Sequence, residues 1–447
     1  MAHDQASGPA LDAGLSEERV KELLRLRDDP EWVRAARREA WQVYDATPMP
    51  SRTDEEWRRT DISQLDLSRV RAFAIPGSRV ASPAELPEVV RSALGSGAEW
   101  SGLLVQHNTG VVYRELDPSL ARQGVILLSL EEAAREHPEL VRRYLGQLVP
   151  ATSGKFAAMN AVFWSGGCFL YVPRGVTVER PIRVLSWWDA PGVGAFPRTL
   201  VVAEANSQVT YLEEFASPEQ EGQAFANGVV EVFAGQGAQV TYLAVQEWNE
   251  QTYAFLNQRQ VVERDATVNT VHVALGGHVS KSHIETRLVG PGATTEMTGV
   301  LFGDKDQHFD HHTLQDHVAP HTTSNLLYKG VLRDHARSVY AGLIRVSKEA
   351  MKTDAYQANR NLLLSDNAKA DSIPKLEIGA NDVRCTHGAT VAPVDEEQVF
   401  YLMARGIPRA EAIQLMVQGF FAPIMDRIPL ASVREKVWAV VDRKVTA

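Results

Sequence analysis

The residue pair with the clearest chemistry is Cys385 and His387, which stand in the run IGANDVRCTHGATVAP with Thr386 between them. On a β-strand, residues i and i+2 share a face, so the thiol and the imidazole would lie side by side, about 7 Å apart. A thiolate suits iron or persulfide sulfur, and an imidazole suits iron. Two ligands are too few for a closed site, so we expect further ligands from another surface. The competing interpretation is a buried cysteine beside a hydrogen-bonded histidine.

A second candidate is a histidine-rich stretch that holds His308, His311, His312, His317 and His321. On a strand, His308, Asp310 and His312 share one face and His311 points away, which would allow a site of two histidines and one carboxylate. The corresponding function would be that of a metal-dependent enzyme. In the competing interpretation, these polar side chains form ladders between adjacent coils of a repetitive β fold and bind no metal.

Composition excludes several classes of protein. The net charge of −10 disfavours nonspecific binding to nucleic acid. The two cysteines, Cys168 and Cys385, cannot build a disulfide framework or a CxxC metal site, which favours a reducing cytoplasm. The N-terminus does not resemble a secretory signal, and no uncharged apolar run reaches the ~18 residues of a membrane span. Cys168, with apolar neighbours in SGGCFLYV, is predicted to lie in the core.

None of the common enzyme motifs is complete. Gly154-Lys155 lacks the upstream glycine of a Walker A loop, and Gly192 with Gly194 lacks the third glycine of a dinucleotide fingerprint. HExxH and GxSxG are absent from the sequence. We therefore expect neither ATP hydrolysis nor the common hydrolase chemistries.

The elements that must position these residues are predicted to be short strands, because residues 155–391 contain runs rich in Val, Thr, Tyr and Phe separated by Gly, Asp or Asn turns. One turn pattern recurs, and its equivalent small residues are Ser207, Ala238, Ala266, Ala293, Ala336 and Ala368. They are spaced 31, 28, 27, 43 and 32 residues apart. A repeat near 30 residues predicts a β-solenoid, with a β-sandwich as the alternative. The interval of 43 is close to three half-periods, which suggests an extra coil.

The predicted helices and strands divide the chain into three regions. Residues 1–150 are mixed and largely helical, with helix from Ser16 to about Tyr44. Residues 151–394 form the β core, and residues 395–447 return to short helices with apolar faces. The last region would cap the solenoid and offer a docking surface.

Several long segments of the sequence resemble a known family. The run NRNLLLSDNAKADSIPKLEIGANDVRCTHGATVAPVDEEQVFYLMARGI, residues 359–407, is similar to the SufB/SufD family of iron–sulfur cluster assembly proteins. Further similarity lies in EEWRRTDIS (55–63), FDHHTLQDHVAPHTTSNLLYKGVL (309–332) and GIPRAEAIQLMVQGFFAPI (406–424). The resemblance therefore extends over most of the chain.

The resemblance favours the SufD branch. SufB-like sequences carry a cysteine where this chain has Asn359, and a glutamate where it has Gly388. The Cys-x-His pair of SufD-like sequences matches Cys385 and His387.

The resemblance implies a right-handed parallel β-helix between helical regions, in a scaffold that is not an enzyme. SufD-like proteins pair with SufB, and the ATPase SufC attaches to their C-terminal helical regions. His387, together with Cys385, would help to receive iron or to hold a nascent iron–sulfur cluster at the SufB junction. No cofactor is expected on the isolated chain, which could form a homodimer.

Overall fold

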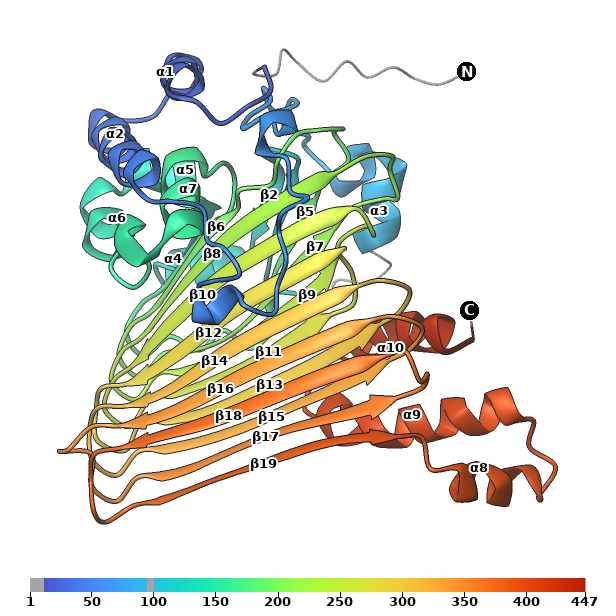
Figure 1. Cartoon of the computed structure of the whole chain (residues 1–447). Coiled ribbons are helices and arrows are strands. Elements are labelled where there is room, and N and C mark those ends of the chain that lie inside the picture. The colour runs from blue at the N-terminus through green and yellow to red at the C-terminus, as the bar shows by residue number, and fades with distance from the viewer. Residues whose placement is uncertain (1–11, 95–99, 447) are drawn as a thin grey trace.

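Two long β-sheets form the body of the molecule in the computed structural model, which describes residues 12–94 and 100–446 (Figure 1). In spatial order, the ten-stranded sheet consists of β19 (Arg384–Pro393), β17 (Asp354–Leu363), β15 (Thr323–Leu332), β13 (Thr294–Gly303), β11 (Thr267–Ala274), β9 (Gln239–Glu247), β7 (Gln208–Ala216), β5 (Ile182–Trp187), β1 (Gly102–His107) and β2 (Gly110–Leu116). The nine-stranded sheet consists of β18 (Lys369–Ile378), β16 (Arg337–Val346), β14 (His308–His317), β12 (Val279–Leu288), β10 (Thr252–Val262), β8 (Ala224–Ala234), β6 (Arg198–Ala203), β4 (Cys168–Val172) and β3 (Ile126–Ser129).

From β4 onward, successive strands alternate between the two sheets, so each coil of the chain adds one strand to each sheet. Neighbouring strands in the described part of the chain pair in parallel, except β1 with β2 and β3 with β4. Buried apolar side chains fill the space between the sheets, among them Cys168, Tyr211 and Val240. The prediction of a parallel β-helix is confirmed, and so is the position of Cys168 in the core.

The repeated turns form the corners of the coils. The small residues Ala238, Ala266 and Ala293 are completely buried, and a residue with positive φ precedes each of them: Gly237, Asp265 and Gly292. Gly237 has a φ of +68°, in the left-handed region that glycine adopts without strain, which favours glycine at this corner. The interval of 43 residues holds the three strands β13, β14 and β15, which is one strand more than a coil, so the expected extra coil is only half a coil. The recurring turn therefore moves from one side of the stack to the other.

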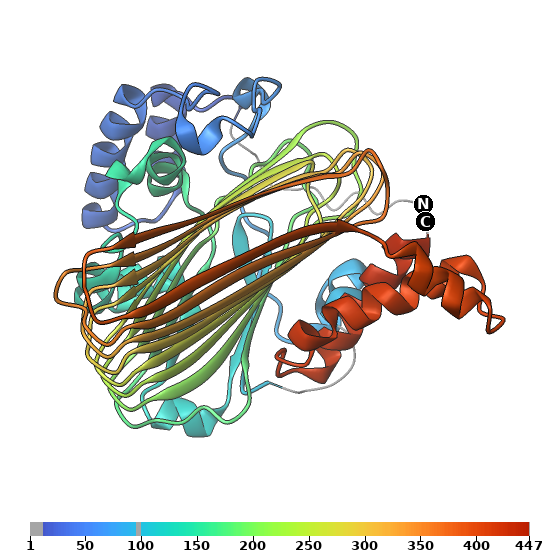
Figure 2. The same ribbon diagram turned by 60° about the horizontal axis from the view of Figure 1, so that its bottom comes forward.

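Helices cover the outer faces of both sheets (Figure 2). The described helices are α1 (Glu17–Leu26), α2 (Glu31–Ala46), η1 (Glu55–Trp57), η2 (Leu67–Arg69), η3 (Pro83–Glu85), α3 (Glu88–Leu94), α4 (Pro118–Arg122), α5 (Leu130–Glu136), α6 (Pro138–Tyr144), η4 (Ala151–Ser153), α7 (Lys155–Phe163), α8 (Glu396–Met403), α9 (Arg409–Met425) and α10 (Ala431–Thr446). Helices α1, α2 and α7 pack on the nine-stranded sheet through residues such as Phe156 and Phe255. Helices α9 and α10 pack on the ten-stranded sheet through residues such as Phe421 and Val437.

Three local expectations differ from the structure. The predicted helix from Ser16 to Tyr44 is two helices, because Pro30 begins α2 after a break. The β region was predicted from about Lys155, but Lys155–Phe163 is helix α7. The strand pair expected near residues 103–106 and 111–115 is present as β1 and β2, but these strands and β3 also extend the two sheets of the solenoid to residues before 151.

Within residues 12–94 and 100–446, no helix combines the length and the apolar character that a membrane crossing requires.

Candidate functional site

Cys385 and His387 lie on β19, the last strand of the ten-stranded sheet. In the ladder with β17, Cys385 is opposite Ala355 and His387 is opposite Gln357. Both of these β17 residues are buried. Since side chains alternate along a strand, Cys385 and His387 share the inward-facing side, and Thr386 faces outward. The spacing predicted this shared face.

The two side chains differ in exposure because β19 ends the stack. Cys385 is half-buried and packs against a cluster that includes Ile344, Val346 and Ala355, whereas His387 is exposed. Burial, followed by the nearby Asp354 carboxylate, raises the pKa of the Cys385 thiol. The thiol is therefore protonated at neutral pH and would release its proton on binding a metal.

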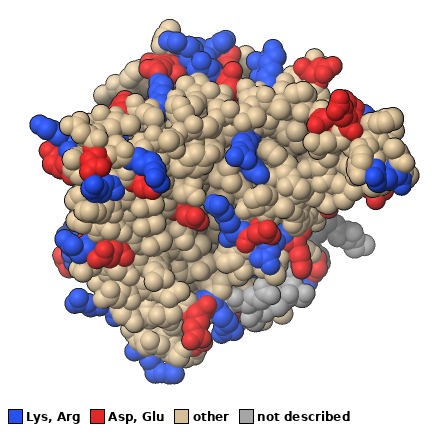
Figure 3. All heavy atoms as spheres, turned by 90° about the horizontal axis from the view of Figure 1, so that it is seen from below, with Lys and Arg blue, Asp and Glu red and all other residues tan. Residues whose placement is uncertain are grey.

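Cys385 and His387 lie at the open end of the stack of coils. Strands β18 and β19 each have one paired neighbour in the described structure, so their outer edges are unpaired. Seen from this end, the molecular surface carries only isolated charged side chains across its middle (Figure 3). Such an edge is a template for strand pairing with another chain.

The two positions on which our expectation of the SufD branch rests, Asn359 and Gly388, lie beside the pair. Asn359 is buried on β17 opposite Ala389, and its Oδ1 accepts a hydrogen bond from Asn361 Nδ2 at 2.7 Å. Gly388 lies between His387 and Ala389 on β19. Asn359 is thus held inside the solenoid by the amide side chain of Asn361 on the same strand.

The histidine-rich stretch spans β14 and the turn that follows it. His308, Asp310 and His312 share one face of the strand and His311 points away, as predicted; the shared face is the outer one, and His311 is buried inside the solenoid. Burial lowers the pKa of the His311 imidazole to about 3. The inward-facing histidine is therefore a neutral core residue.

The predicted trio does not form one ligand set. Thr60 Oγ1 lies 2.9 Å from His308 Nε2 and donates a hydrogen bond of 2.5 Å to Asp310 Oδ2. Lys281 Nζ also donates to Asp310 Oδ2, at 2.5 Å. Burial alone would raise the pKa of the Asp310 carboxyl, but hydrogen bonding to His312 and the charge of Lys281 hold it below its usual value. Asp310 is thus an ionised partner of Lys281.

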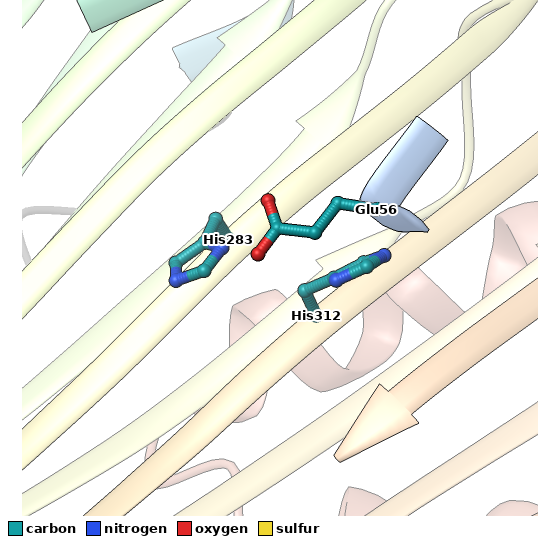
Figure 4. A group of neighbouring side chains, drawn as sticks. All are labelled: Glu56, His283 and His312. Carbon is teal, nitrogen blue, oxygen red and sulfur yellow. The ribbon is translucent and has the colours of Figure 1, made fainter. Parts of the chain in front are cut away.

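The structure brings a different set together, which consists of Glu56, His283 and His312 (Figure 4). One possible ligand atom from each of these residues lies within 4.8 Å of the others, and no other such set occurs among the described residues. Burial lowers the pKa of the His283 imidazole to about 4, so the ring is neutral at neutral pH. Glu56 comes from η1 and His283 from β12, and no local pattern in the sequence links them to β14.

A cleft of about 500 Å³ opens beside this set. Its lining includes Glu56, His283, Lys281 and the N-terminal end of α7 at Lys155. The set is thus accessible from solvent.

Comparison with known proteins identifies the family. Residues 19–184 match the family described as "SufBD protein N-terminal region". Residues 187–420 match the one described as "SUF system FeS cluster assembly, SufBD core domain". The chain belongs to the SufBD family. The match extends from the N-terminal helices to α9, and it includes both Cys385 and Glu56.

SufBD relatives are similar to this chain over nearly its whole length. An iron–sulfur cluster assembly SufBD family protein of Staphylococcus epidermidis is 29% identical over 425 residues, which are 93% of this chain and 90% of that protein. A Bacillus subtilis protein named iron–sulfur cluster assembly protein SufB is 28% identical over the same shares of the two chains. Iron–sulfur cluster assembly in the SUF system is therefore the process to which this SufBD protein belongs.

Proposed function

We propose that this SufBD protein is a SufD-like scaffold subunit and not an enzyme. In this proposal, Cys385 and His387 form half of a site that receives iron or holds a nascent iron–sulfur cluster. One observation carries the proposal: the thiol and the imidazole share a face on the terminal strand of the solenoid, at an unpaired sheet edge. The remaining ligands would come from a SufB subunit paired at this edge, in a reducing, cytoplasmic setting.

The chemistry of the pair supports this role. A thiolate and an imidazole are ligands for iron, and a half-buried thiol with a raised pKa binds metal poorly until a second surface completes the site. The SufD-like identity rests on Asn359 and Gly388, which replace the two ligands that SufB-like sequences carry. Iron or a cluster is the cargo of this site, and the isolated chain would hold neither.

The test is the replacement His387→Ala in the complex co-purified with SufB and SufC. We expect a several-fold loss of iron and acid-labile sulfide, because the imidazole would be one of few ligands to the cargo. Thr386→Ala, which changes the outward-facing neighbour on the same strand, is the matched control and should leave both contents unchanged. Iron and sulfide contents that His387→Ala leaves at the control level would remove His387 from the mechanism.

We further propose that SufC binds the C-terminal helices, chiefly α8. The side chains of Phe400, Tyr401 and Met403 on α8 are 72%, 56% and 43% exposed. In Figure 1, α8 projects away from the body of the solenoid. An apolar face on a projecting helix suits docking to a groove of another protein.

A further inference from the structure

A short segment of the N-terminal region crosses the outer face of the nine-stranded sheet and brings Glu56 to two histidines. We call this segment, residues 55–60, the strap. Trp57 of the strap stacks on Phe156 at 5.3 Å between ring centroids, and Lys375 Nζ lies 2.6 Å from Glu55 Oε1. Lys281 Nζ donates a 2.8 Å hydrogen bond to the Glu56 carbonyl oxygen. The strap is thus fixed on both sides of Glu56.

The two histidines are direct neighbours across a pair of parallel strands. His283 on β12 is opposite His312 on β14 in the ladder, so both imidazoles project from the same face. Their ring centroids are 6.3 Å apart, and their planes differ by 22°. The Glu56 carboxylate reaches toward these rings from the strap (Figure 4). Three separate parts of the chain therefore converge on one point.

A buried carboxylate orients one of the rings. His312 Nε2 lies 3.0 Å from Asp310 Oδ1, and Asp310 is 1% exposed. Among the described residues, no other group donates a hydrogen bond to this oxygen. A carboxylate behind a histidine fixes the orientation of the ring and raises the basicity of the nitrogen that faces a metal. Asp310 would therefore support His312 from behind and would not bind the metal.

The positive charge of Lys281 beside His312 is neutralised by the Asp310 carboxylate. The Lys281 ammonium lies 3.1 Å from His312 Nε2, but it is paired with Asp310 at 2.5 Å. Because Lys281 is paired with Asp310, the Glu56 carboxylate faces the His283 and His312 rings. A carboxylate oxygen and two imidazole nitrogens that converge on one point can bind a divalent cation.

We propose that Glu56, His283 and His312 bind a divalent first-row transition-metal ion such as Zn²⁺ or Fe²⁺. Two imidazoles and one carboxylate are ligands that these ions accept, whereas Ca²⁺ and Mg²⁺ prefer sites made of oxygen atoms. Water from the adjacent cleft completes the coordination. The site is distinct from Cys385 and His387 and does not depend on the proposed function.

The test uses Co²⁺ as a spectroscopic probe of the full-length protein. To exclude binding at the open end of the stack, the titration is performed in a Cys385→Ser, His387→Ala background. We expect one equivalent of Co²⁺ to bind with visible absorption bands, and Zn²⁺ to displace it. Glu56→Gln and His283→Ala should each weaken binding at least tenfold, because each removes one of three protein ligands.

His335→Ala is the matched control, since His335 is an exposed histidine in a turn of the same solenoid. It should bind Co²⁺ as the background protein does. Glu56 is exposed, so Glu56→Gln should fold normally, and a thermal unfolding curve verifies this. The absence of stoichiometric binding, or undiminished binding by Glu56→Gln and His283→Ala, would overturn the proposal. Either result leaves the iron and sulfide test of His387 unaffected, so the two proposals fail independently.

Discussion

Glu213 shows at the level of one residue how the solenoid interior controls a charge. It is completely buried on β7, where its Oε1 accepts a 2.6 Å hydrogen bond from Thr199 and its Oε2 one of 2.6 Å from Tyr242. Burial raises the pKa of the Glu213 carboxyl from 4.5 to about 7, although both hydrogen bonds lower it. The folded protein therefore keeps a proton that the unfolded chain has already released.

This difference predicts a pH dependence of stability. Between pH 4.5 and about pH 7, the folded state binds more protons than the unfolded state, so the free energy of unfolding falls as the pH rises. The expected loss is roughly 3 kcal/mol over this window. Glu213→Gln should remove the dependence and stabilise the protein above pH 7, as measured by urea unfolding at several pH values. The exposed Glu221→Gln is the control, and a Glu213→Gln variant that kept the original slope would contradict the assignment.

The sequence could predict the site only where its residues are close together in the chain. The period of two in a strand was enough to place Cys385 with His387, and His308 with Asp310 and His312. Glu56 and His283 could not be found in this way, because they meet His312 only through the path of the strap and the register of β12 on β14. The partners of Asp310, Thr60 and Lys281, are likewise non-local. Ligand sets that depend on tertiary packing leave no local pattern.

Helices and strands whose apolar and polar residues alternate with a regular period could be predicted from the sequence, and those without such a period could not. The alternation of strands and the recurring corner alanines predicted the solenoid, and the interval of 43 residues has its explanation in three strands. Helix α7 was missed because seven of its nine residues, Lys155–Phe163, are buried, so it has no polar stripe and no helical periodicity. The break between α1 and α2 depends on Pro30, which the apolar spacing alone does not detect.

At the same scale, the exposed face of α8 predicts where SufC binds. Deleting residues 395–447 would be a poor test, because α9 and α10 cover apolar residues of the ten-stranded sheet such as Leu243 and Val300. Phe400→Ser changes only an exposed side chain. It should weaken SufC binding about tenfold or more if Phe400 is a central contact, as measured with purified SufC by titration calorimetry.

Val89→Ser on α3 is the matched control for Phe400→Ser, since Val89 is 49% exposed and lies in a different part of the fold. It should bind SufC as the unmodified protein does. Equal affinities for Phe400→Ser and Val89→Ser would mean that SufC docks elsewhere.

For the whole molecule, the stack of coils has one covered end and one open end. At the first end, helix α4 packs Leu120 against the core between the sheets, and the Val80 amide donates a hydrogen bond to the Val112 carbonyl oxygen of β2. At the other end, β18 and β19 keep unpaired edges, while the C-terminal helices cover the side of the stack. The unpaired N–H and C=O groups of an exposed strand edge can pair with a strand of another chain. We therefore predict that the isolated chain self-associates through the edge of β19.

Ala389→Pro tests this self-association. The Arg384 amide donates to Thr353 next to β17, so the amides of 385, 387 and 389 point to the open edge, because N–H groups alternate along a strand. Proline at 389 thus removes an edge donor and leaves the ladder with β17 intact. The dimer dissociation constant, measured by sedimentation equilibrium, should rise at least tenfold for Ala389→Pro and stay unchanged for Thr386→Ala. A monomeric mass for the unmodified chain at micromolar concentration, or equal dimerisation by Ala389→Pro, would show that the edge is not used in this way.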